Sequence, residues 1–178
     1  MGWIKAIIKT DKGNVLYAQN KSSAGPRRTG YNRPVPTRLR MGLVMRRDMT
    51  FGALGDVEGA LRAEGVGLAP ISTGDASLMA GGVTVLATAT AKDIAEGRLK
   101  GLIVPGGSID EASVAAVRSL VDLARSSGLK VIAFADGVAL AAASFGVAAE
   151  ADGAVFEADA ATPLTERIDL TKAVAAIV

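Results

Sequence analysis

The sequence predicts an α/β protein, a three-layer flavodoxin-like sandwich with a mainly parallel sheet. Two observations carry this prediction: short apolar runs alternate with amphipathic helical segments, and the apolar runs end in glycine-rich turns. The clearest unit spans 101–137, where the apolar runs 102–104 and 131–134 flank a helical segment. Two parallel strands joined by a right-handed crossover are the natural fold of such a unit.

Ligand sites in parallel sheets lie at the carboxyl ends of the strands, so the turns at 105–108 and 135–137 are expected at one edge of the sheet. In the helix between the two strands, Ser108 is expected to be the cap, because Glu111 follows at the capping-box spacing. Gly128 is expected to end this helix.

The remaining apolar runs predict further elements of the same body. Strands are expected at 41–45, 66–72, 83–88 and 153–157, helices at 51–65, 138–145 and 164–178, and a polar connection at 89–100. Gly52, Gly55 and Gly59 lie inside the helix predicted at 51–65. Gly55 and Gly59 would share a face, which indicates either a tight helix–helix or dimer contact, or simple packing against the sheet.

The first 40 residues differ from the body. Residues 3–10 and 14–19 are rich in β-prone side chains around Asp11-Lys12-Gly13-Asn14, which predicts a hairpin. Residues 20–40 lack periodicity and hold three prolines, two glycines and six basic residues. We interpret them as an extended basic arm that binds a polyanion or an acidic surface, or as a solvated linker. The arm's candidate contact residues are Arg27, Arg28, Tyr31, Arg33, Arg38 and Arg40. The expected division is therefore 1–40 and 41–178.

Composition excludes several kinds of chemistry. The 178 residues include no cysteine and no histidine, so thiolate nucleophiles, Ser-His-Asp machinery and imidazole metal ligands are absent from the sequence. We expect no metal and no cofactor. No apolar run reaches the length of a membrane span, and the first residues lack a signal-peptide layout, so we expect a cytoplasmic protein without membrane association.

Charge is divided unevenly along the chain. Residues 1–48 carry eleven Lys and Arg against two Asp, a net charge of +9, whereas residues 49–178 carry nine against sixteen Asp and Glu, a net charge of −7. Such asymmetry indicates binding to nucleic acid or to an acidic protein surface. A second copy of the chain offers an acidic surface too. An exposed hairpin edge and a shortened C-terminal half would also leave apolar surface to bury, so we expect a homo-oligomer.

The order strand, Pro-Gly-Gly, helix, strand, small residue–x–Gly resembles the ThiJ/PfpI superfamily of class I glutamine amidotransferase-like folds. The resemblance covers roughly 40–158, because GLVMRRDMTFGALGDVEGALRAEG is similar to the first strand and helix of that family. The resemblance implies a cysteine nucleophile two residues before an elbow glycine, with the N–H groups of a glycine pair beside it.

This sequence departs from that pattern at the residues that carry the chemistry. The glycine pair matches Gly106 and Gly107, and the elbow glycine matches Gly137, but the nucleophile position holds Ala135. The histidine that often follows the family's cysteine is replaced by Asp136. The position of the assisting glutamate falls near Ala53, so that group is missing as well.

Three functions are compatible with these observations. The first is a pseudoenzyme of the ThiJ/PfpI type that acts as a binding or self-assembling module through its basic N-terminal extension. The second is a hydrolase or amidotransferase-related enzyme with altered chemistry at Asp136. The third is a small-molecule sensor that holds its ligand with Gly106, Gly107, Ser108 and Asp136. Fold alone cannot choose among them.

Overall fold

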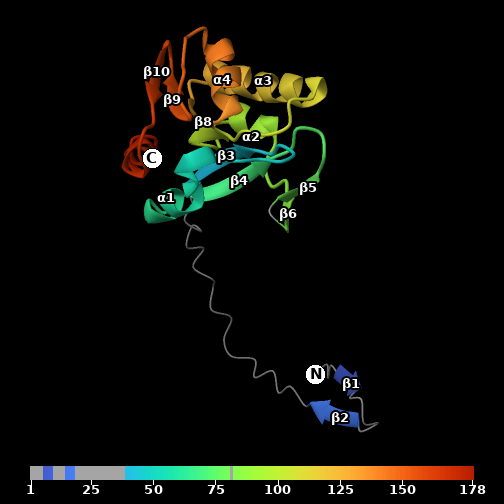
Figure 1. The fold of residues 1–178 in the computed structure, drawn as a ribbon. Helices are drawn as coiled ribbons and strands as arrows, with labels where there is room; N and C mark the ends of the chain where they lie inside the picture. The colour runs from blue at the N-terminus through green and yellow to red at the C-terminus, as the bar shows by residue number, and fades with distance from the viewer. Residues whose placement is uncertain (1–5, 10–14, 19–38, 81) are drawn as a thin grey trace. The chain divides into compact units, whose positions relative to one another are not determined.

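The computed structural model describes residues 6–9, 15–18, 39–80 and 82–178 (Figure 1). The chain divides into two units, Met1–Pro36 and Thr37–Val178. In the first unit, β1 (Ala6–Lys9) and β2 (Val15–Ala18) pair in antiparallel fashion, with Ile7 opposite Tyr17. The strands of the predicted hairpin are therefore confirmed, while its turn and the arm before Leu39 lie outside the described residues.

The second unit is a three-layer α/β fold built on a six-stranded sheet of order β10-β9-β8-β7-β3-β4 (Figure 1). Its strands are β3 (Arg40–Val44), β4 (Gly67–Ile71), β7 (Gly101–Val104), β8 (Lys130–Phe134), β9 (Gly153–Glu157) and β10 (Ala160–Pro163). The strands β4, β3, β7 and β8 run parallel, whereas β9 and β10 are antiparallel to their neighbours. The predicted fold class and the parallel pairing of 101–104 with 131–134 are confirmed.

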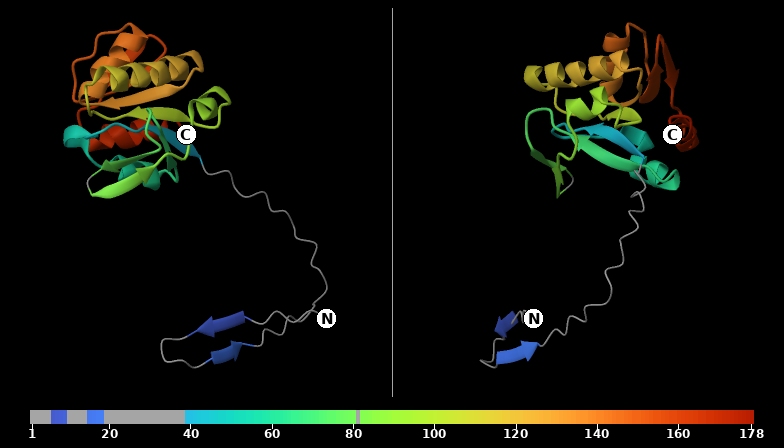
Figure 2. Two further views of the ribbon diagram at one scale, coloured as in Figure 1. Left: turned by 90° about the vertical axis from the view of Figure 1, so that its right-hand side faces the viewer. Right: turned by 180° about the vertical axis from the view of Figure 1, so that it is seen from behind.

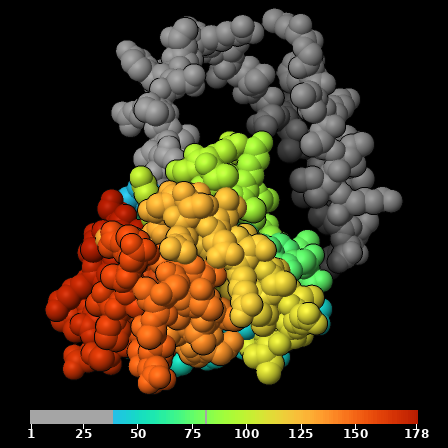
Figure 3. Space-filling model, turned by 90° about the horizontal axis from the view of Figure 1, so that it is seen from above, coloured from blue at the N-terminus to red at the C-terminus, as the bar shows by residue number. Residues whose placement is uncertain are grey.

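Helices cover both faces of this sheet. They are the 3-10 helix η1 (Gly52–Leu54) and the α-helices α1 (Val57–Ala63), α2 (Ala91–Ala95), α3 (Glu111–Ser126), α4 (Asp136–Phe145) and α5 (Arg167–Ala175). One hydrophobic cluster joins α2, α3 and α4 to the sheet, and a second joins η1, α1 and α5 to the opposite face (Figure 2). Figure 3 shows the molecule from the side of α3 and α4.

The central strands read as unbroken apolar runs because both of their faces are buried. Leu102 and Val104 of β7 point into the cluster under α2–α4, and Ile103 points into the opposite cluster. In β8, Ile132 and Phe134 likewise face η1, α1 and α5. All four residues of β7 are buried, which places this strand at the centre of the fold.

The helix predicted at 51–65 begins later than expected. Gly52 and Gly55 lie before α1, both with positive φ, and Asp56 is the N-cap. The Gly59 N–H donates to the Asp56 carboxylate at 2.9 Å, and a Cβ at position 59 would lie 2.5 Å from both of its oxygens. The glycine at 59 therefore makes room for a helix cap, so the predicted shared face of Gly55 and Gly59 is wrong.

Two further predictions need correction. The cap of α3 is Asp110 instead of Ser108, because the Asp110 carboxylate accepts the Ser113 N–H at 2.9 Å. The strand predicted at 83–88 exists as β6 (Val83–Leu86), but it pairs with an unpredicted strand, β5 (Ser77–Ala80), in a separate hairpin. Within the described residues, no helix has both the length and the apolar character needed to cross a bilayer.

Candidate functional site

Three loops meet at the carboxyl edge of the sheet. They follow β3, β7 and β8, and contain residues 45–50, 105–108 and 135–137. From β3 the chain adds β4 on one side, then crosses to β7 on the other side of β3. The direction of strand addition reverses between β3 and β7, and ligands of open α/β sheets bind in the crevice at such a reversal. The predicted site residues around 106–108 and 135–137 are brought together here.

The turn from β8 into α4 keeps a strained elbow. Ala135 has φ 49° and ψ −130°, a conformation that non-glycine residues rarely adopt. Gly137 follows in a crowded position, since a Cβ there would lie 2.8 Å from the carbonyl oxygens of both Val104 and Pro105. The backbone therefore presents residue 135 at a sharp strand-to-helix turn, but the side chain it presents is a methyl group.

The guanidinium of Arg46, which follows β3, is fully buried at this edge of the sheet. Its Nη1 donates to the Pro105 carbonyl at 2.9 Å, and its Nη2 donates to the Ser108 carbonyl at 2.6 Å. Nη1 also lies 2.9 Å from Oδ2 of Asp136. One side chain after β3 thus binds the loop after β7 and the first residue of α4.

Asp136 completes this arrangement from the elbow. Its Oδ2 pairs with Arg46, and its Oδ1 accepts the Gly107 N–H at 2.9 Å. Its position in the first turn of α4 is also favourable for a negative charge near the helix N-terminus. Both carboxylate oxygens are engaged and the side chain is still 40% exposed, so Asp136 pairs with the buried guanidinium while facing solvent.

The N–H groups of the glycine loop are also bonded within the protein. Gly106 exchanges two backbone hydrogen bonds with Thr50, at 2.9 and 3.1 Å, and the Ser108 N–H donates to the Arg47 carbonyl at 2.8 Å. With the Gly107 N–H on Asp136, all three donors of residues 106–108 have partners. A ligand that used these donors would have to displace the existing bonds.

Glycine at position 107 is required by the buried arginine. A Cβ on Gly107 would lie 2.8 Å from Cβ of Arg46 and 2.7 Å from the Arg47 carbonyl oxygen. The Nε of Arg46, which lies beside Gly107, is buried without a hydrogen-bond partner. The glycine loop is therefore packed directly against the guanidinium.

Sequence analysis missed Arg46 and Thr50. Arg46 and Arg47 follow the apolar run of β3 as a pair, and the sequence does not reveal that Arg46 is buried and Arg47 exposed. The Cγ2 of Thr50 and the Cβ of Ala135 approach the same side of Gly106. The residue predicted at the position of the assisting glutamate, Ala53, is exposed in η1.

A shallow hollow of about 210 Å³ lies beside this crevice and is lined by Arg47, Asp75 and Asp110 among others. Arg47 pairs with Asp75 at 3.0 Å, and this hydrogen bond raises the pKa of the guanidinium above its ordinary value. The Ser113 N–H and the Ser108 hydroxyl lower the pKa of Asp110. The stability that the two bonds to the Asp110 carboxylate give is therefore present above the ordinary pKa of aspartate and is lost as the pH falls through the lowered pKa of this group.

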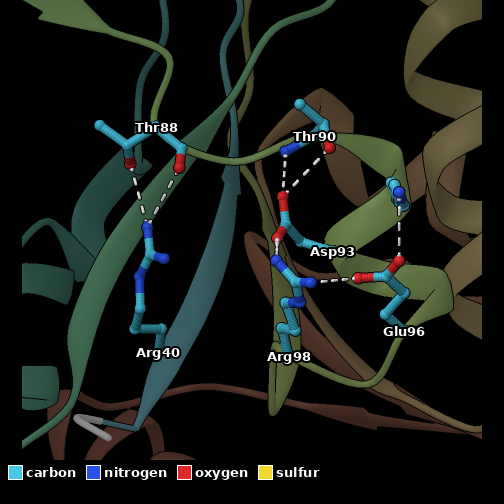
Figure 4. A network of polar contacts seen from close by, with 7 residues as sticks. Arg40, Thr88, Thr90, Asp93, Glu96 and Arg98 are labelled. Carbon is cyan, nitrogen blue, oxygen red and sulfur yellow. Dashed lines mark hydrogen bonds and ion pairs between the residues drawn. The ribbon is translucent and has the colours of Figure 1, made fainter. Parts of the chain in front are cut away.

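Of the six candidate contact residues in the basic arm, the structure describes Arg40 alone. It is the first residue of β3, and its Nη2 donates to the carbonyl and hydroxyl oxygens of Thr88 at 3.3 and 3.2 Å (Figure 4). Thr90, Asp93, Glu96 and Arg98 form a neighbouring surface network, as expected for the polar connection. Arg27, Arg28, Tyr31, Arg33 and Arg38 lie outside the described residues.

Comparison with solved structures finds a similar fold in proteins of the DJ-1 superfamily. A candidate protease I from Bacteroides thetaiotaomicron is 9% identical with a TM-score of 0.58, over 79% of this chain and 99% of the other. A DJ-1 superfamily protein from Agrobacterium tumefaciens is 15% identical with a TM-score of 0.56, over 75% and 86%. A cysteine-to-alanine mutant of a DJ-1 superfamily protein from Salmonella typhimurium is 12% identical with a TM-score of 0.54, over 77% and 86%.

These similarities establish the fold of the chain, and the predicted resemblance to ThiJ/PfpI proteins is confirmed at that level. The sequence matches no family model and no curated protein.

The strained elbow generates a stability prediction. Replacing Ala135 by glycine should raise the free energy of unfolding by about 1 kcal/mol, because glycine adopts this conformation without strain. Urea unfolding measures the change. The matched control is Ala139→Gly, at an exposed position inside α4, which should lower stability by about 1 kcal/mol. Destabilisation by both substitutions to the same extent would show that the elbow carries no strain.

Proposed function

We propose that this protein is a pseudoenzyme of the DJ-1/ThiJ/PfpI fold that acts as a binding or self-assembling module through its basic N-terminal extension. The proposal rests on the elbow at Ala135, its backbone conformation and the bonding of the polar groups around it. A nucleophile's backbone conformation is retained at Ala135, while the polar groups around it are bonded to one another. Nothing at this position can attack a substrate.

The charge distribution supports a binding role. The N-terminal 48 residues carry +9 and the remainder −7, so a polyanion or the acidic body of another copy is a complementary partner. Nucleic acid and an acidic protein surface are the two partners that this charge favours.

An altered enzyme is the second candidate, and the exposed face of the Asp136 carboxylate favours it. A base or nucleophile at this point would have to release Arg46, whose charge would then remain buried without a partner. Such an unpaired charge costs several kcal/mol. The small-molecule sensor requires the N–H groups of residues 106–108 to release their internal partners in the same way.

The activity test uses the intact protein. We expect no hydrolase, deglycase or amidotransferase turnover, and Ala135→Cys should not restore it, because the sequence holds no histidine and the loop after β3 presents Thr50 to the elbow. Reaction with a thiol reagent confirms that the new cysteine is accessible. Turnover by the unmodified chain that disappears in Asp136→Asn would establish the altered enzyme instead.

The arm test separates its two partners. Charge-neutralising Arg27, Arg28, Arg33 and Arg38 together should abolish nucleic-acid retention if the partner is nucleic acid, or dissolve the oligomer if it is another copy. Either interaction should weaken as salt rises, since exposed charges are screened beyond about 8 Å at physiological ionic strength. A matched control neutralises Arg62, Arg98, Arg118 and Arg125 of the body. An arm variant whose nucleic-acid retention, assembly and salt dependence are all unchanged would reduce the arm to a linker.

A further inference from the structure

A groove of about 370 Å³ lies between α5 and the strands β9 and β10 (Figure 1). Its volume is at the lower end of the range of small-ligand sites, which runs from about 300 to 1,000 Å³. None of the residues that line it belongs to the loops 45–50, 105–108 or 135–137. The groove is therefore separate from the site around Arg46 and Asp136.

One face of α5 forms a wall of this groove. Lys172, Ala173 and Ala176 line it, and their spacing of one and four residues places them on neighbouring positions of the helix surface. The strands supply Val155 of β9 and Thr162 of β10, which are cross-strand partners. The groove thus combines an apolar surface with one ammonium group and one hydroxyl group.

The other charged side chains in the groove have partners within the protein. Lys130 lies 3.0 Å from Oε2 of Glu157. The Oδ2 of Asp169 accepts two backbone N–H groups and a hydroxyl from residues 165–166, at 3.0 to 3.2 Å. Among the residues that the structure describes, Lys172 has no ion-pair partner within 4.0 Å. Lys172 is therefore the cation that can pair with a ligand in the groove.

We infer that this groove binds a small amphipathic monoanion, such as a short-chain carboxylate, with its hydrocarbon on Val155 and Ala173 and its charge on Lys172. Removal of the hydrocarbon from water favours binding, and the Lys172 ammonium and the Thr162 hydroxyl can both donate to a carboxylate. A single ammonium acts as a point charge, which suits a ligand with one negative charge. The groove lies in the α/β body, so this site goes beyond the binding role proposed for the N-terminal extension.

The test titrates the ¹⁵N-labelled full-length chain with octanoate and follows its amide resonances. Those of α5, β9 and β10 should shift together, with a dissociation constant on the order of 1 mM, as expected for a ligand of about ten non-hydrogen atoms. Octanol lacks the charge and should bind about fivefold more weakly. Acetate lacks the hydrocarbon and should leave these resonances unchanged.

Two matched pairs of variants test the two parts of the site. Lys172→Gln should raise the dissociation constant of octanoate about fivefold, whereas Lys100→Gln, an exposed lysine that does not line the groove, should leave it unchanged. Ala173→Phe fills the groove and should abolish binding. Ala175→Phe, at an exposed position of α5 outside the groove, should not. If Ala173→Phe does not fold, Lys172→Gln decides alone.

Three results would overturn the inference: resonance shifts outside α5, β9 and β10, equal dissociation constants for Lys172→Gln and Lys100→Gln, or full binding by folded Ala173→Phe. Reduced self-association of Ala173→Phe without any octanoate binding would assign the groove to a second copy and would overturn the inference too. Neutralising the N-terminal arm should leave octanoate binding unchanged, so the groove and the proposed role of the extension can fail independently.

Discussion

The buried guanidinium of Arg46 is the constraint on which the carboxyl edge of this protein depends. A charge without solvent contact needs partners, and here they come from two loops: the Pro105 and Ser108 carbonyls after β7 and the Asp136 carboxylate after β8. Loss of the Asp136 carboxylate would leave the buried charge without its ion-pair partner. The positions of the glycine loop and of the first turn of α4 are therefore set together.

Because of the interaction between Arg46 and Asp136, the backbone at this edge resembles a ligand site while its polar groups are bonded to one another. Open α/β sheets bind ligands where strand addition reverses, and the elbow at Ala135 lies at that edge with a positive φ of 49°. The buried Arg46 guanidinium, however, lies at this edge, and the donors of residues 106–108 are bonded internally.

Periodicity was sufficient for the parallel core because β3, β7 and β8 are apolar on both faces and end in turns. Periodicity did not predict the features that depend on one side chain, namely the helix caps and the buried arginine. Asp110 and Asp56 cap α3 and α1 through their carboxylates. The spacing rules favoured Ser108 as the cap of α3 and placed Asp56 inside a helix. The elbow was located through the glycines at 106, 107 and 137, whose crowding the structure explains. The burial of Arg46 could not be predicted, because it depends on loops about 60 and 90 residues further along the chain.

The central claim is that Arg46 and Asp136 stabilise the fold as a pair. The most direct measurement is a double-mutant cycle of Arg46→Met and Asp136→Ala by urea unfolding. Asp136→Ala alone should cost about 3 kcal/mol, at the lower end for a buried pair because Asp136 is partly exposed. The double variant should be more stable than that single variant, since methionine removes the unpaired charge. Additive losses in the cycle would contradict the claim and would mean that the two side chains do not depend on each other.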